Sequence, residues 1–205
     1  MDGEAIGTLE DETFSADGVK ITIHGVSTHP GYAIGKLENA LKIAAEILAK
    51  LPKDKLSPET TQDKEGFIHP VHMEGIQEKA VVSFIIRDFT VAGLHEKEAL
   101  LKSIVEEVLK DYPNSSAEFK VQEQYRNMKE VLDQHPEVIQ NALKAMERAG
   151  LNPIQRSIRG GTDGSRLSFM GLPCPNIFAG EHAFHSKLEW ASVQDMEKAV
   201  ETIVN

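Results

Sequence analysis

The chain has 205 residues, of which 40% are hydrophobic and 26% are charged, as in an ordinary globular protein with one domain or two small ones. Its formal net charge of -10 argues against nucleic acid and anionic membranes as partners, because an acidic chain repels phosphate groups. No apolar run approaches the roughly 20 residues that span a bilayer, the first residues lack the features of a secretory signal, and a single cysteine favours a reducing cytoplasm.

Strand and helix patterns alternate in the first part of the chain. Alternating apolar and polar residues predict strands, and apolar residues spaced three and four apart predict helices. The expected elements are strands over 19–25, 66–76, 79–89 and 117–121 and helices over 39–51 and 94–109. Their order is β-α-β-β-α-β, which is the ferredoxin-like motif. We therefore expect an α/β (α+β) protein with a ferredoxin-like domain over residues 18–127.

The last part of the chain has a different character. We expect helices over 135–149 and 192–204, strands over 154–158 and 174–178, and a short helix through 166–169. Proline near the start of the first helix and glycine after its end mark the helix boundaries. This part has too few strands to close an α/β sheet, so it resembles a piece of a larger sandwich.

Two groups of polar residues earlier in the chain suggest no chemistry. The acidic run Glu10-Asp11-Glu12 predicts a solvated surface. His69 and His72 lie three apart on one expected strand, so a regular strand places them on opposite faces, where they cannot chelate one ion.

Two loops carry side chains that suit catalysis or binding. His29 lies in the loop 25–31 just after a strand, and an exposed histidine there suits donation to a carbonyl or an oxyanion. An ordinary loop histidine fits the pattern equally well. Arg159 precedes the glycine-rich turn 160–164, where backbone can approach a ligand and the guanidinium matches a carboxylate. A plain tight turn with an exposed arginine is the alternative.

A third candidate is the segment Glu181-His182-Ala183-Phe184-His185. Two histidines beside a carboxylate suggest a metal site, although the spacing is not that of a His-Glu-x-x-His helix. A histidine after an apolar residue such as Phe184 is also commonly structural. The residues themselves leave both interpretations open.

Together these segments resemble the peptidase T family, which comprises tripeptide aminopeptidases among the zinc exopeptidases. The matching stretches are Asp2-Gly3, His29-Pro30-Gly31, 84–89, 158–164, 167–176 and Phe184-His185. The resemblance covers the whole chain and corresponds to the C-terminal half of the family's length. It implies a lid and dimerisation domain over 18–127. It also implies a truncated α/β catalytic domain, with a remnant over 1–17 and a C-terminal segment over 128–205.

The resemblance implies metal and catalytic roles for three residues. The family's zinc ligands fall on Asp2 and His185, although Glu4 replaces the second glycine of the family's Asp-Gly-Gly turn. The full-length site holds two zinc ions, and this chain is expected to bind them only in part or not at all. The lid histidine that acts in catalysis, commonly in a neighbouring subunit's site, falls on His29.

The resemblance also implies a substrate pocket. The family's two contacts to the substrate carboxylate fall on Arg87 and Arg159, and the backbone of Gly161-Thr162 lines the same pocket. The expected substrates are short peptides, chiefly tripeptides.

The function that the resemblance implies is that of the C-terminal portion of a zinc aminopeptidase, which releases the N-terminal residue of tripeptides and dimerises through its lid domain. The family's remaining metal ligands and its general base lie upstream of the matching part, so we expect the chain alone to be inactive. Two alternatives stay open. The chain is either a non-catalytic dimerisation or ligand-binding module, or part of a related zinc exopeptidase or deacylase with another substrate.

Overall fold

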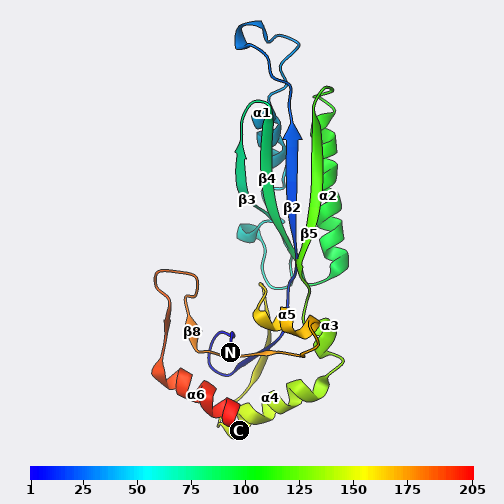
Figure 1. Cartoon of the computed structure of the whole chain (residues 1–205). Helices are drawn as coiled ribbons and strands as arrows, with labels where there is room; N and C mark the ends of the chain where they lie inside the picture. The colour runs from blue at the N-terminus through cyan, green and yellow to red at the C-terminus, as the bar shows by residue number, and fades with distance from the viewer. The chain divides into compact units, whose positions relative to one another are not determined.

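The structure is a computed structural model that describes all 205 residues, and these form two compact units. We call residues 15–124 the inserted unit, and residues 1–14 together with 125–205 the split unit. Figure 1 shows helices and strands in both, so the predicted mixed α/β class is confirmed. No helix is both long and apolar enough to cross a membrane.

The inserted unit is built around a four-stranded sheet with two long helices. Its elements are β2 (Ser15–His24), η1 (Pro30–Tyr32), α1 (Ala40–Ala49), η2 (Pro58–Thr60), β3 (Phe67–Gly75), β4 (Lys79–Asp88), α2 (Val91–Leu109) and β5 (Ser116–Tyr125). The strand order is β3-β4-β2-β5 (Figure 1), and β4 pairs antiparallel with both neighbours. This arrangement confirms the ferredoxin-like motif predicted from the β-α-β-β-α-β order.

The core of this unit follows directly from the sequence periodicity. Alternate residues of β4 are buried, and α1 buries residues three and four apart that pack on the same face of the sheet. Asn39 caps α1 by accepting the amide of Leu41, and Thr90 caps α2 by accepting the amide of Gly93. Because Thr90 is the cap, α2 begins at Val91, three residues before the predicted start at Leu94.

Strand β3 is irregular, and this changes the placement of two histidines. Its register with β4 shifts between Pro70 and His72, as at a β-bulge. His69 pairs with Ile85 and His72 pairs with Ser83, so both histidines lie on the same face of the sheet. The prediction of opposite faces is wrong, because it assumed a regular strand. The two histidines still belong to no cluster of three potential metal ligands.

The split unit has a smaller sheet and more irregular chain. Its elements are β1 (Thr8–Thr13), α3 (Lys129–Leu132), α4 (Pro136–Arg148), β6 (Ile154–Ile158), α5 (Asp163–Phe169), β7 (Asn176–Ile177), β8 (Glu181–His182), β9 (Trp190–Ala191) and α6 (Val193–Val204). The sheet order is β6-β1-β7, with β1 parallel to β6 and antiparallel to β7. The buried cluster of this unit comprises Leu9, Met146, Phe178 and Ala199.

Three features of the split unit differ from expectation. The acidic run 10–12 belongs to the central strand β1, where Glu10 is only 1% exposed, so the predicted solvated surface is wrong for that residue. Strand β7 covers only two of the five residues predicted. Helix α5 begins at Asp163, because Thr162 and Ser165 form a capping box, so part of the glycine-rich segment is helical.

Candidate functional site

A cavity of about 380 Å³ lies in the split unit. It combines five of the seven site residues predicted from the sequence, from both ends of the chain: Asp2, Arg159, Gly161, Thr162 and His185. The other lining residues are Gly3, Glu4, Ile158, Gly160, Glu181 and Phe184. The remaining predicted residues, His29 and Arg87, belong to the inserted unit.

The first wall of the cavity is the segment 2–4, which lies beside residues 177–179. The amide of Gly3 donates to the carbonyl of Ile177 at 3.1 Å, and the carbonyl of Gly3 accepts from Ala179 at 2.9 Å. A side chain at Gly3 has no room, since a Cβ there would lie 2.6 Å from Oε2 of Glu10 and 2.8 Å from the Ile177 carbonyl oxygen. Glycine at this position therefore lets the segment carrying Asp2 lie flat against its neighbours.

Glu10 is a buried carboxyl packed against this wall. Its Oε1 accepts the amide of Glu4 at 3.0 Å, and its Oε2 is the atom that excludes a side chain at Gly3. Burial raises the pKa of the Glu10 carboxyl from 4.5 to about 7, against the lowering effect of the Glu4 amide. The group thus exchanges its proton near neutral pH, unlike the solvated glutamate that we predicted.

The second wall is the run 158–162, between β6 and α5. Cζ of Arg159 lies 5.2 Å from the ring centroid of Phe14, within cation–π range. The carbonyl of Gly160 accepts the Phe14 amide at 3.1 Å. Buried Ser165 donates from Oγ to Oγ1 of Thr13 at 3.0 Å, which ties the start of α5 to β1.

The third wall is the loop between β8 and β9, which carries His185. Ala183 and His185 have positive φ angles of 54° and 60°, a left-handed conformation that costs about 1–2 kcal/mol for a residue with a Cβ. The amide of His185 donates to Oε2 of Glu189 at 2.7 Å, and Oγ of Ser186 donates to the Ala183 carbonyl at 2.6 Å. These bonds hold the strained loop in one shape, as is common at functional sites.

The two histidines of this segment have different surroundings. The ring of His182 stacks on Trp190 with centroids 4.2 Å apart, and its Nε2 lies 3.8 Å from Oδ2 of Asp195. His182 does not line the cavity, whereas His185 does. The structure thus separates a packing histidine from a candidate ligand, a distinction that the sequence left open.

The charges in the cavity have both signs. Asp2, Glu4 and Glu181 supply carboxylates, and Arg159 supplies a fixed cation. Such a set suits a metal ion or an ammonium group beside a carboxylate. No three His, Cys, Asp or Glu side chains come together to hold a metal ion, whereas a catalytic zinc commonly has three protein ligands. The residues of this chain therefore do not fit a complete metal centre.

His29 and Arg87 are placed by elements of the inserted unit. His29 caps the short helix η1, and its Nδ1 accepts the amide of Gly31 at 3.1 Å. The neutral ring therefore has its proton on Nε2, where it can be donated outward. Arg87 lies in β4, paired with Ala16 on β2 and with Phe67 on β3.

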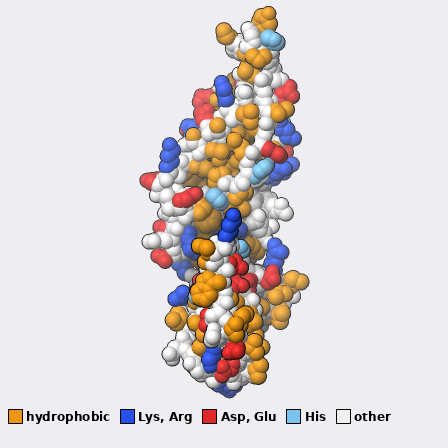
Figure 2. Space-filling view, turned by 90° about the vertical axis from the view of Figure 1, so that its left-hand side faces the viewer, with side chains coloured by type: hydrophobic (Ala, Val, Ile, Leu, Met, Phe, Trp, Pro, Cys, Tyr) orange, Lys and Arg blue, Asp and Glu red, His pale blue; other side chains and the backbone are white.

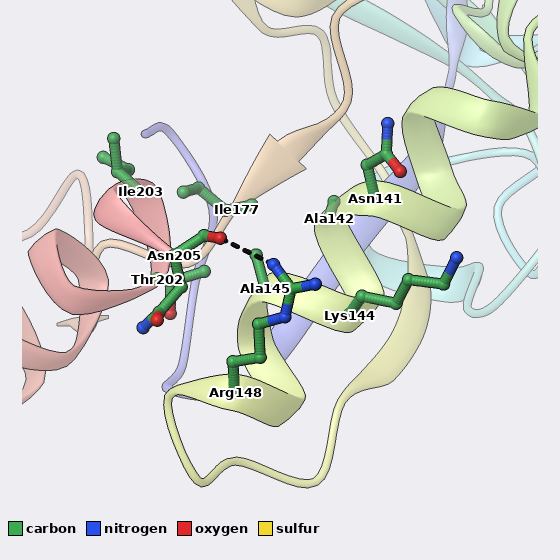
Figure 3. A pocket seen from close by; sticks show the side chains of 9 residues that line it. All are labelled: Asn141, Ala142, Lys144, Ala145, Arg148, Ile177, Thr202, Ile203 and Asn205. Atoms are coloured by element: carbon green, nitrogen blue, oxygen red, sulfur yellow. Dashed lines mark hydrogen bonds between the residues drawn. The ribbon is translucent and has the colours of Figure 1, made fainter.

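A second cavity of about 390 Å³ lies between α4 and α6 and has a different character (Figure 3). Arg148 there donates from Nη1 to the backbone oxygen of Asn205 at 2.9 Å, and Lys144 extends away from this contact in Figure 3. Both cations are exposed. The residues that line this cavity do not form a recognisable catalytic or metal-binding set.

Residues 12–116 match the family described as the peptidase dimerisation domain, which is just over half of the chain. The chain belongs to this family. The match extends over nearly all of the inserted unit, with β2, α1, β3, β4 and α2.

Curated relatives match the whole chain. It is 44% identical over 204 residues to Peptidase T of Caldanaerobacter subterraneus subsp. tengcongensis and 46% identical over 204 residues to Peptidase T of Shewanella pealeana. The predicted resemblance to the peptidase T family is confirmed. In both cases the match covers 100% of this chain and 50% of the relative, so the chain spans about half the length of these proteins.

Solved structures share the fold. The aminopeptidase PepT of Bacillus cereus superposes with a TM-score of 0.79 at 23% identity, covering 100% of this chain and 54% of that one. A tripeptidase of Staphylococcus aureus gives 0.82 at 15% identity, covering 98% and 53%. A dinuclear metal-binding peptidase of the M20 family from Bacillus subtilis gives 0.64 at 15% identity, covering 97% and 52%.

Several residues that shape the cavity were not predicted. Glu4 lines it, and Glu10, Phe14 and Glu189 hold its walls. Glu181 also lines the cavity, and the sequence indicated it only as the carboxylate beside two histidines. The others gave no signal in the sequence, because their roles depend on contacts that only the folded chain makes.

Proposed function

We propose that this chain is part of a zinc-dependent aminopeptidase that releases the N-terminal residue of tripeptides in the cytoplasm. In this proposal, residues 18–127 form the lid and dimerisation domain, and residues 1–17 with 128–205 belong to the catalytic domain. The observation that carries the proposal is the cavity in which Asp2, Arg159 and His185 meet. The identity with proteins named Peptidase T supports the reaction class.

Asp2 and His185 are proposed as a partial set of zinc ligands. Carboxylate and imidazole are ordinary zinc ligands, and both line the same cavity. The remaining ligands and the general base would come from residues outside these 205. Purified chain with added zinc is therefore expected not to release alanine from trialanine. Zinc-dependent release above that of zinc in buffer, measured by amino-acid analysis, would contradict this partial assignment.

Arg159 is proposed to bind the C-terminal carboxylate of the peptide, with the backbone of Gly161-Thr162 beside it, and Arg87 is proposed as a second contact from the inserted unit. The acidic residues Glu4 and Glu181 in the same cavity would attract the substrate's ammonium group. A short peptide carries both charges, which fits the mixed charge of the cavity. His29, with its proton on Nε2, would donate to the developing oxyanion in a neighbouring copy's site.

A chimera tests the arginine assignment. This chain would replace the matching half of the Caldanaerobacter Peptidase T, and we expect zinc-dependent hydrolysis of trialanine. Arg159→Ala should raise KM about 10- to 100-fold with little change in kcat, because a charge-assisted hydrogen bond to substrate is lost. The matched control is Arg156→Ala, an exposed arginine three residues earlier. An unchanged KM in Arg159→Ala would remove Arg159 from the substrate pocket.

The inserted unit is proposed to form a homodimer through the edge strand β3 and the start of α1. β3 is an edge of the sheet, and edge strands offer unpaired backbone groups to another chain. Exposed apolar residues lie on or next to these two elements: Leu41 on α1, Val71 and Met73 on β3, and Ile76 directly after β3. Figure 2 views the chain from this side and shows hydrophobic side chains gathered over the inserted unit.

A pair of substitutions at the two sheet edges tests the dimer. Met73 on β3 and Val121 on β5 are 48% and 47% exposed, so lysine at either costs little in folding. Met73→Lys should convert the dimer to monomer in sedimentation velocity, and Val121→Lys should leave it intact. The reverse result would place the interface at β5. If the wild-type chain sediments as a monomer, the proposal of a homodimer is wrong.

A further inference from the structure

The wall that carries Arg159 lies mostly outside regular secondary structure, because β6 ends at Ile158 and α5 begins at Asp163. Five consecutive residues, 158–162, line the cavity, and two of them are glycines, whose backbone is the least restricted. The arginine side chain is long and loses rotamer freedom when it is held in one orientation. A preorganised binding site needs such groups fixed before the ligand arrives. The residues packed against this wall therefore decide how well Arg159 can act.

Phe14 contacts this wall in two ways. Its ring is fully buried, at 0% exposure, and Cζ of Arg159 lies over it at 5.2 Å from the centroid. Its amide donates to the carbonyl of Gly160 at 3.1 Å. One residue thus holds both the side chain of the arginine and the backbone next to it.

Neighbouring contacts keep Phe14 itself in place. Oγ1 of buried Thr13 receives a hydrogen bond from Ser165 Oγ at 3.0 Å and another from the Met128 amide at 3.2 Å. The amide of Thr13 donates to Oδ1 of Asn127 at 3.1 Å. Thr13 is therefore tied both to α5, through Ser165, and to the segment 127–128, and these bonds hold the neighbouring Phe14 in place.

Tyr125 supports the other part of the turn. A Cβ at Gly161 would overlap the ring of Tyr125, so that ring lies directly against the Gly161 backbone. Phe14 and Tyr125 are also the residues at which the chain leaves the split unit and re-enters it. The two aromatic residues that contact the turn are thus the last residue of the split unit before the inserted unit and the first residue after it.

We propose that Phe14 is a positioning residue for Arg159, whose ring face holds the guanidinium at the cavity wall in the orientation that receives a carboxylate. Phe14 does not line the cavity and does not contact substrate. The face of an aromatic ring attracts a guanidinium through its quadrupole, so the effect depends on the electrons of the ring as well as on its volume. The inference rests on the proposed function only for its ligand, a peptide carboxylate.

The test separates ring electrons from ring shape. In the purified chain, Phe14 is replaced by 3,5-difluorophenylalanine, which keeps the shape and weakens the negative face, and in a second variant by leucine. Two readouts are taken: the Nε–Hε resonance of Arg159, and the dissociation constant of trialanine with its C-terminal amide as the control ligand. Urea unfolding is measured on every variant.

We expect the Arg159 resonance to move in both variants, and trialanine binding to weaken about 3- to 10-fold in Phe14→Leu. The difluoro variant should show an intermediate loss at wild-type stability. Binding of the amide should stay constant throughout. An unmoved Arg159 resonance in the difluoro variant overturns the inference, even if Phe14→Leu is too unstable to study. Equal binding of trialanine and its amide by wild type instead rejects the carboxylate assignment, while the resonance still decides the role of Phe14.

Discussion

The two units differ in how completely each covers its apolar residues. The inserted unit buries a cluster of seventeen hydrophobic residues drawn from its sheet and both long helices, whereas the split unit buries a cluster of four. Helix α6 of the split unit exposes a stripe of apolar residues spaced three and four apart: Val193, Met196, Val200 and Ile203. Uncovered apolar stripes of this kind mark surfaces that contact other protein.

This difference shows that the larger apolar core and the candidate cavity lie in different units of the chain. The inserted unit has the contacts of an independently folding domain, yet it contains none of the residues that line the candidate site. The split unit contains that site, with a strained loop and a buried carboxyl, on a much smaller core. Strain and buried polar groups lower stability, so we expect the split unit to be the less stable of the two.

The largest expected effect is on the core of the inserted unit. Phe84 is 1% exposed in the middle of β4, and Phe84→Ala should lower the free energy of unfolding by about 3–5 kcal/mol, because it leaves a cavity in a packed core. Ile34→Ala, at a residue that is 98% exposed, is the control and should change it by less than about 0.5 kcal/mol. Urea denaturation followed by circular dichroism measures both. Similar values for the two variants would show that the inserted unit lacks a tightly packed core.

The next largest effect is a pH dependence of the stability of the split unit, caused by Glu10. The folded pKa is raised from 4.5 to about 7, so the folded state binds more protons than the unfolded state between these values, and stability falls as pH rises. The full loss above pH 7 is about 3 kcal/mol, at about 1.4 kcal/mol per pKa unit. Glu10→Gln should remove this loss, so the stability of the variant relative to wild type should rise between pH 4.5 and 8.

Stability measured by urea at several pH values, as the difference between wild type and Glu10→Gln, isolates this carboxyl from all others. A difference that stays constant with pH would mean that Glu10 keeps an ordinary pKa. Hydrogen exchange should place the pH-dependent change in the split unit, since Glu10 contacts Gly3 and Glu4 there.

The smallest of the three effects is expected at the two glycines of the cavity wall, Gly160 and Gly161. Gly161→Ala should lower the stability of the split unit by about 1–3 kcal/mol, because its Cβ overlaps the ring of Tyr125. Gly160→Ala is the matched control, since its Cβ would meet only Ile158 at 3.6 Å, an ordinary contact. Thermal unfolding followed by calorimetry compares them. Equal effects of the two alanines would show that the Tyr125 contact does not hold the turn.

Sequence reasoning was most successful where the pattern within one element is enough to predict that element. The alternation in β4 and the helical spacing in α1 gave both elements nearly to the residue, because each pattern reflects one buried face. It failed for β1, where a glutamate occupies a buried position, since an acidic residue ordinarily signals solvent. It also failed for the bulge in β3, because an extra residue in one strand is defined only by its pairing with the next.

The sequence by itself determined the fold of the inserted unit and, through resemblance, which residues to consider for a site. Local periodicity and motif residues are properties of short segments, so they can be read along the chain. Only the tertiary structure decided that Asp2, Arg159 and His185 share one cavity, that Glu10 is buried, and that Phe14 lies against Arg159. These facts depend on which distant segments are packed together, and burial and pKa follow from that packing.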